Sequence, residues 1–236
     1  MNPKYRKKVI FNQFFGVGDI LFIEPIIRKF FQEGHEVILP VLPKFLDLQP
    51  YFPYIKFVDM NQLNIDYDSK VIVNTEEHTI IPLRWGKEFF NGTYNDTMRN
   101  KYRMVNMELS EFRNLKWLRH RVKENELLRL LGIQEGEKYN LINKNFHTFL
   151  NGTVKIDVKN NYKNVYMNII KDFTLLDWAS VIENATEIHS VNTSILFLLE
   201  SLDLKAENIH LYGRNDGGSE FPKTTYLHSK NYILHI

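Results

Sequence analysis

Residues 9–39 read VIFNQFFGVGDILFIEPIIRKFFQEGHEVIL, and this stretch decides the fold. The short apolar run at residues 9–11 predicts a buried strand, and a turn with two glycines follows it. Apolar residues then recur at helical spacing over residues 20–32, and residues 36–39 predict the next strand. Strand, turn, helix and strand in this order form the βαβ unit of a parallel α/β sheet.

The same rhythm continues along the rest of the chain. Short apolar runs predict further strands, at residues 55–58, 70–73, 139–143, 154–156, 165–169, 187–191 and 208–212. Apolar spacing and capping residues predict further helices, at residues 110–131, 174–182 and 195–202. Gly132 closes the first of these helices and begins a linker. We therefore expect an α/β protein of two small Rossmann-like lobes, residues 1–132 and 133–236, with parallel sheets and flanking helices.

Composition excludes several classes of protein. The 236 residues include 30 Lys and Arg against 28 Asp and Glu, a net charge of +2 that argues against a dedicated nucleic-acid binder. Cysteine is absent, which excludes disulfides, thiolate metal sites and cysteine nucleophiles. No apolar run approaches the ~18–20 residues of a membrane span, and polar residues interrupt the region where a signal peptide is apolar. We expect a cytoplasmic protein without a membrane span.

The turn at residues 16–19, Gly-Val-Gly-Asp, is the strongest local feature. Gly16 and Gly18 let backbone amides approach a ligand, and the start of the following helix favours anions. Leu21 stands where a dinucleotide fingerprint has its third glycine, and no P-loop lysine follows. Asp19 either interacts with the helix dipole as an ordinary first-turn carboxylate or serves as a general base facing an interlobe cleft.

Two segments carry a resemblance to a known family. Residues 16–21, GVGDIL, followed by PIIR at 25–28, resemble the N-terminal signature of the lipopolysaccharide heptosyltransferases. LLDWASVIENA at residues 175–185 and IHSVNTS at 188–194 are similar to that family's donor-side helix and to its loop with Asp-Thr-Gly. Asn192 replaces the aspartate and Ser194 the glycine, so the chain is identified as a compact, divergent member.

The resemblance implies a GT-B-like glycosyltransferase. Such an enzyme transfers a sugar from a nucleotide-sugar donor to the hydroxyl of a glycan or other acceptor, with inversion and without a metal or further cofactor. Residues 1–132 become the acceptor side, with Asp19 as general base, and residues 133–236 the donor side. Backbone amides beside Asn192, Thr193 and Ser194 would hold the diphosphate; an ordinary helix N-cap is the alternative for these residues.

Other candidates lie in loops after predicted strands. Lys144, Asn145 and His147 occupy the loop that faces the donor phosphates in the family, and the alternative is a solvated loop. On the acceptor side, Gly16, Gly18, His78, Arg84 and Trp85 are expected to line the cleft, with Arg84 binding an anionic acceptor and Trp85 either stacking on a sugar or packing between lobes.

Two further functions remain open at this stage. Asp66-Tyr67-Asp68 matches the Asp-x-Asp motif of metal-dependent glycosyltransferases, although a solvated turn explains it as well. The departures at Asn192 and Ser194 also suit a non-catalytic nucleotide-binding, glycan-binding or assembly protein on the same scaffold.

Overall fold

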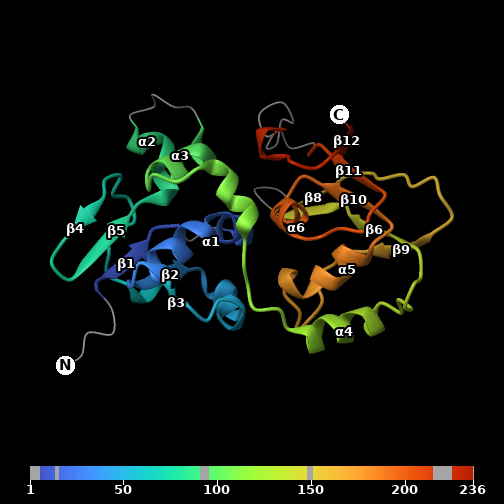
Figure 1. Ribbon diagram of the computed structural model, residues 1–236, viewed down its shortest axis with the longest axis horizontal. Helices are drawn as coiled ribbons and strands as arrows, with labels where there is room; N and C mark the ends of the chain where they lie inside the picture. The colour runs from blue at the N-terminus through green and yellow to red at the C-terminus, as the bar shows by residue number, and fades with distance from the viewer. Residues whose placement is uncertain (1–5, 14–15, 91–95, 148–150, 215–224, 236) are drawn as a thin grey trace. The chain divides into compact units, whose positions relative to one another are not determined.

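The structure is a computed structural model that describes residues 6–13, 16–90, 96–147, 151–214 and 225–235 (Figure 1). The chain divides into two compact units, Met1–Leu118 and Arg119–Ile236. Each unit contains a mainly parallel sheet with helices beside it, so the predicted fold class is confirmed. None of the described helices is both long and apolar enough to cross a membrane.

The first unit has a five-stranded sheet in the order β3-β2-β1-β5-β4. Its strands are β1 (Lys8–Phe11), β2 (Glu36–Val41), β3 (Ile55–Asp59), β4 (Val73–Asn74) and β5 (His78–Ile81). β4 pairs antiparallel with β5, and the other pairings are parallel. The sequence did not predict β5, which lies beside β1. The strand predicted at residues 70–73 shares only Val73 with the observed β4. β1 therefore has β2 on one side and β5 on the other, and the strand order reverses there.

The long helix α1 (Val17–Gln32) anchors this unit, and it starts close to the predicted position. Its residues 20–27 are all buried, Pro25 among them. The Tyr102 hydroxyl donates to the Phe22 carbonyl oxygen at 2.6 Å, which fastens α3 (Thr97–Arg103) to α1. The remaining helical segments are η1 (Pro43–Tyr51), η2 (Met60–Gln62), η3 (Leu83–Trp85), α2 (Gly86–Phe89) and η4 (Leu109–Asn114).

The predicted helix at residues 110–131 was wrong in its middle. The structure has η4 and then α4 (Arg121–Leu130), with non-helical chain between them. In that interval the Lys116 amide donates to the Glu24 carboxylate at 2.9 Å, and the Leu118 amide to the Tyr51 carbonyl oxygen at 2.8 Å. These tertiary hydrogen bonds use the amides that a continuous helix would need, so packing overrides the local helical preference.

The second unit has a five-stranded parallel sheet in the order β12-β11-β10-β6-β9. Its strands are β6 (Tyr139–Asn143), β9 (Lys163–Tyr166), β10 (Glu187–Val191), β11 (Asn208–Tyr212) and β12 (Tyr232–His235). β6, β10 and β11 have their predicted bounds; the predicted strand at 154–156 is absent from this part of the described chain, and β12 was missed. A hairpin of β7 (Asn145–His147) and β8 (Asn151–Thr153) follows β6. The strand order reverses between β6 and β10.

Helical segments of the second unit include α4, η5 (Leu175–Trp178), α5 (Ala179–Asn184), α6 (Ile195–Ser201) and η6 (Thr225–Leu227). The predicted capping box at Thr174 and Asp177 is present at the start of η5. α4 belongs to this unit, whereas the predicted boundary at residue 132 assigned it to the first lobe.

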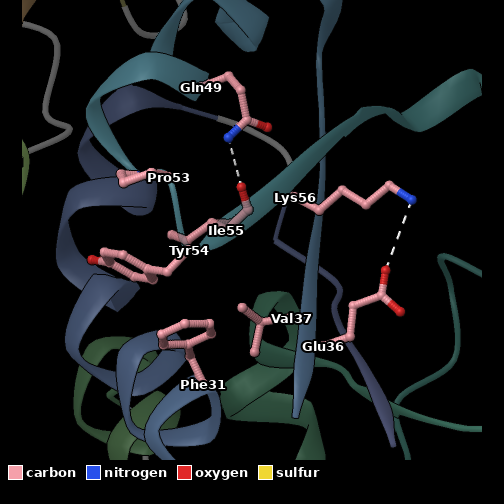
Figure 2. Close-up of a pocket in the computed structure, with 8 residues that line it drawn as sticks. All are labelled: Phe31, Glu36, Val37, Gln49, Pro53, Tyr54, Ile55 and Lys56. Carbon is pink, nitrogen blue, oxygen red and sulfur yellow. Dashed lines mark hydrogen bonds and ion pairs between the residues drawn. The ribbon is translucent and has the colours of Figure 1, made fainter. Parts of the chain in front are cut away.

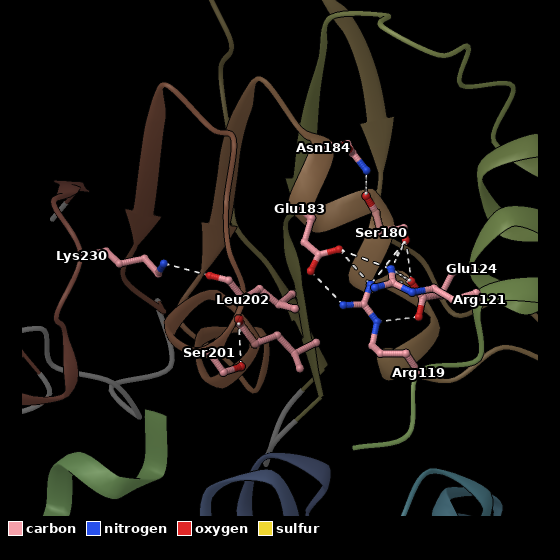
Figure 3. Close-up of polar contacts among 10 residues, drawn as sticks. Arg119, Arg121, Glu124, Ser180, Glu183, Asn184, Ser201, Leu202 and Lys230 are labelled. Atoms are coloured by element: carbon pink, nitrogen blue, oxygen red, sulfur yellow. Dashed lines mark hydrogen bonds and ion pairs between the residues drawn. The ribbon is translucent and has the colours of Figure 1, made fainter. Parts of the chain in front are cut away.

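An ion-pair network explains why α4 lies with the second unit (Figure 3). Arg119 bridges Glu124 of α4 and Glu183 of α5, with Nη1 2.8 Å from the Glu183 carboxylate and Nε 2.6 Å from that of Glu124. Ser180 also donates to Glu124. Burial alone would raise the pKa of Glu124, but the hydrogen bonds from Arg119 and Ser180 and the charges of Arg119 and Arg121 outweigh it and lower the pKa below 4.5.

Candidate functional site

The first candidate site lies at the carboxyl ends of β1 and β5, where ligands bind in open α/β sheets. Asn12 joins the loops after both strands: its carbonyl oxygen accepts from the Arg84 amide at 2.9 Å, and its Nδ2 donates to the Tyr67 carbonyl oxygen at 2.8 Å. Trp85 Nε1 donates to the same carbonyl oxygen at 3.0 Å. The guanidinium carbon of Arg84 lies over the Trp85 ring, 4.4 Å from the ring centroid. The structure thus places two predicted acceptor-side residues, Arg84 and Trp85, at this end of the sheet.

A buried lysine that the sequence analysis missed holds Asp19. Lys101 Nζ lies 2.7 Å from Asp19 Oδ1 and 2.7 Å from Gln13 Oε1. The Lys101 side chain is 2% exposed, whereas that of Asp19 is 33% exposed. The carboxylate therefore has one oxygen fixed by a buried ammonium while part of the group remains open to solvent. The helix α3 that carries Lys101 comes from a stretch without clear periodicity, so no local signal pointed to it.

The two glycines of the turn have ordinary positions. Gly16 is the N-cap of α1 with extended backbone at φ −125°, a conformation that any residue adopts, and Gly18 is already inside the helix. No capping side chain is present among the described residues. Asp19 lies in the first turn, where its charge suits the helix dipole, while its Oδ1 is committed to Lys101.

His78 does not join this group, whereas the Asp-x-Asp segment does, through the Tyr67 carbonyl oxygen and through Asp68 Oδ1, which lies 4.0 Å from Arg84 Nη1. His78 begins β5 and pairs in register with Lys8, so it lies at the opposite end of the sheet from Asp19. Asp66 Oδ1 accepts from the Asp68 amide at 2.9 Å, an Asx-turn contact, and both side chains are exposed. The two carboxylates therefore lie in an exposed turn, and the Tyr67 carbonyl oxygen between them accepts from Asn12 and Trp85.

The second candidate site lies at the carboxyl ends of β6 and β10. Asn143 ends β6, and its Nδ2 donates to Ser190 Oγ at 3.0 Å and to Thr193 Oγ1 at 3.2 Å. The Asn192 amide donates to the Tyr212 carbonyl oxygen at 3.0 Å. Asn143, Ser190 and Asn192 are all buried. Sequence reasoning selected Asn192 and Thr193 but not Asn143 or Ser190, although Asn143 is the first residue of the predicted loop.

The other predicted donor residues have mixed positions. Ser194 is the N-cap of α6, but its side chain makes no capping hydrogen bond, so simple capping does not account for it. Lys144 Nζ lies 5.2 Å from the centroid of the Tyr166 ring, on the β9 side of β6. Asn145 accepts from Thr153 Oγ1 at 3.0 Å within the hairpin. His147 ends β7, and its side chain lies outside the described part of the structure.

A hollow of about 780 Å³ lies in the first unit (Figure 2). Glu36 and Val37 at the start of β2 and Ile55 at the start of β3 line it, which places it at the amino ends of these strands. Lys56 Nζ is 3.8 Å from Glu36 Oε1 at its edge. None of the predicted site residues contributes to its lining, so the hollow is separate from the residues around Asp19.

Comparisons with known proteins assign no family. No family model matches the chain, and no curated protein matches it. Among solved structures, it is similar to TibC, an iron-containing dodecameric glycosyltransferase from enterotoxigenic E. coli H10407, with a TM-score of 0.48 and 11% sequence identity. The match covers 89% of this chain and 58% of that one, so the chain spans less than two thirds of that structure. The resemblance to heptosyltransferases stays a prediction.

Proposed function

We propose that this chain is a glycosyltransferase that moves a sugar from a nucleotide-sugar to an acceptor hydroxyl. One observation supports the proposal most. In each unit the strand order reverses once within the parallel strands, and at both reversals the loops after the two strands carry the residues that the sequence analysis selected. Such reversals create the crevices in which α/β proteins bind ligands.

In this proposal the second unit holds the donor. Asn143 fixes the Ser190 and Thr193 hydroxyls beside the start of α6 and so positions the loop whose backbone amides suit a diphosphate. α6 has only seven residues, so its dipole contributes less than these side chains and backbone amides. Lys144 would add a cation from the adjacent loop.

In the first unit, Asp19 is the proposed general base. Lys101 and Gln13 fix the geometry around Oδ1, and Oδ2 would accept the proton of the acceptor hydroxyl as its oxygen attacks the anomeric carbon. The nucleoside diphosphate leaves with the bonding electron pair, and the configuration at the anomeric carbon inverts. In this proposal no metal takes part in the step.

Nucleotide binding tests the donor assignment. A panel of nucleoside diphosphates and nucleotide-sugars is added in a thermal-shift assay, where a ligand at 100 times Kd stabilises by ~2.7 kcal/mol. We expect one nucleotide to raise the melting temperature. Asn143→Asp should weaken the affinity for that nucleotide at least about tenfold, because the new charge repels the diphosphate. Asn184→Asp makes the same change outside the crevice and is the matched control. No shift with any nucleotide would refute the proposal in favour of an assembly protein.

Transfer itself tests Asp19. We expect the double variant Asp19→Asn/Lys101→Met to keep the nucleotide-induced shift but to lose transfer by about 100-fold or more, the usual contribution of a general base. Full transfer by this variant would remove Asp19 from the mechanism, and loss of transfer in EDTA would favour the metal-dependent alternative.

A further inference from the structure

A cluster of histidines on the second sheet lies apart from the proposed donor site. His189 of β10 is the register partner of His210 of β11, and Tyr212 of β11 is the partner of His235 of β12. Their side chains therefore share one face of the sheet, together with Glu187 two residues before His189. None of these residues was selected from the sequence.

The distances within the cluster suit metal coordination. Glu187 Oε2 lies 3.2 Å from His189 Nε2, and the rings of His189 and His210 stack at 4.4 Å between centroids and 3° between planes. One ligand atom from each of these three residues lies within 4.8 Å of the others. Tetrahedral zinc with bonds of ~2.0–2.1 Å separates its ligand atoms by about 3.4 Å. Closing the set therefore needs a shift of roughly 1–1.5 Å and a rotation of the two imidazoles out of their parallel stack, because an ion lies in the plane of each ring that binds it.

Each candidate ligand also has an outer partner. The Nδ1 atom of His189 lies 3.2 Å from the Tyr212 hydroxyl, and that of His210 lies 2.9 Å from His235 Nε2. Asn160 Nδ2 donates to Glu187 Oε2 at 2.8 Å. Metal-binding histidines nearly always engage their second ring nitrogen in this way, which fixes the ring and leaves Nε2 for the ion.

We propose that Glu187, His189 and His210 form a binding site for one divalent transition-metal ion, with zinc as the preferred ion and water as the fourth ligand. A hydrogen bond between Glu187 and His189 explains only part of the cluster, since it does not account for the second imidazole, that of His210, beside the first. Ile233, the register partner of His210, is 44% exposed, so solvent reaches this face of the sheet.

The position of the site points to a structural role. Glu187 is the first residue of β10, whereas the proposed donor crevice follows the last residue of the same strand. An ion held by two adjacent strands would cross-link β10 and β11. The site does not depend on the proposed glycosyl transfer, and metal binding can be measured in a protein without that activity.

Equilibrium dialysis of the full chain with Zn²⁺, and the visible spectrum with Co²⁺ in its place, test the site. We expect one ion per chain and the intense absorption of four-coordinate cobalt. Glu187→Gln and His210→Gln should each weaken Zn²⁺ binding by more than about 100-fold, and Tyr212→Phe, which removes an outer partner, by about 10–100-fold. His78→Gln, a histidine of the other unit, should bind as the unchanged protein does.

Two results would overturn the proposal. One is the absence of stoichiometric Zn²⁺ binding to the unchanged protein. The other is binding that survives Glu187→Gln with its stoichiometry and cobalt spectrum intact, because that variant keeps the shape of the side chain and removes only the charged ligand. Should His210→Gln fail to fold, Glu187→Gln and Tyr212→Phe decide the question by themselves.

Discussion

Replacing Asp19 is expected to destabilise the first unit more than replacing its partner Lys101. Removing one member of a buried ion pair costs about 3–5 kcal/mol when the other charge stays buried. In Asp19→Asn the lysine, 2% exposed, loses its counter-charge. Gln13 and the new amide oxygen still accept from Nζ, and solvent already screens the one-third-exposed carboxylate, so we expect about 2–3 kcal/mol.

Lys101→Met leaves the Asp19 carboxylate without its partner, but this charge is more exposed to solvent than the lysine is. Asp19 remains partly hydrated in the first turn of α1, where a negative charge interacts well with the helix dipole. The main cost is the buried Gln13, which loses its donor, so we expect about 1–2 kcal/mol. The double variant should cost little more than Lys101→Met alone, which gives a coupling free energy of about 2 kcal/mol.

Urea unfolding measures this cycle. In a shared Trp178→Phe background, the fluorescence of Trp85 and Trp117 reports only the first unit, which contains both. The reasoning fails if Asp19→Asn costs less than Lys101→Met, or if the coupling free energy is below about 0.5 kcal/mol, the level at which independent sites add.

Three further predictions concern the second unit. Thr174→Ala removes the hydroxyl of the capping box with Asp177 and should cost about 1 kcal/mol in urea unfolding, whereas Thr174→Ser should cost much less. Gly152→Ala should destabilise the β7–β8 hairpin, measured as faster hydrogen exchange there, because the new Cβ would lie 2.1 Å from the Phe146 ring. Because the pKa of Glu124 is lowered in the folded state, its stabilisation is present above the ordinary pKa of 4.5 and is lost as pH falls below it. Urea midpoints should show a smaller loss of stability on acidification in Glu124→Gln than in the unchanged protein; equal losses would contradict this.

Local signals predicted the fold where strands are apolar and bounded by turn residues. β6, β10 and β11 have the predicted bounds, and each carries branched aliphatic or aromatic residues at positions that are buried in a parallel sheet. β5 was missed because its four residues begin with a polar pair, His78 and Thr79, directly after two glutamates. β12 was missed because Ile233 and Leu234 are exposed at the sheet edge, where little burial pattern develops.

Only the part of the candidate site that depends on neighbours in sequence could be predicted. Asp19 follows a glycine turn and precedes an amphipathic helix, so its place at the strand end could be inferred from neighbours in sequence. Lys101 is 82 residues away, and its burial depends on how α3 packs on α1 through Tyr102. Contacts of that kind arise from tertiary packing, which a single sequence does not display as a periodic pattern.

That missed contact changes what a variant of Asp19 can reveal. With Asp19 as the candidate general base, the direct test is a single variant such as Asp19→Ala. The buried ammonium of Lys101 makes the single variant destabilising as well, so its loss of transfer would have two causes. Converting Lys101 to methionine in the same protein removes the stranded charge, and only then does the absence of the carboxylate report on proton transfer. The stability cycle is therefore the control that gives the kinetic experiment its meaning.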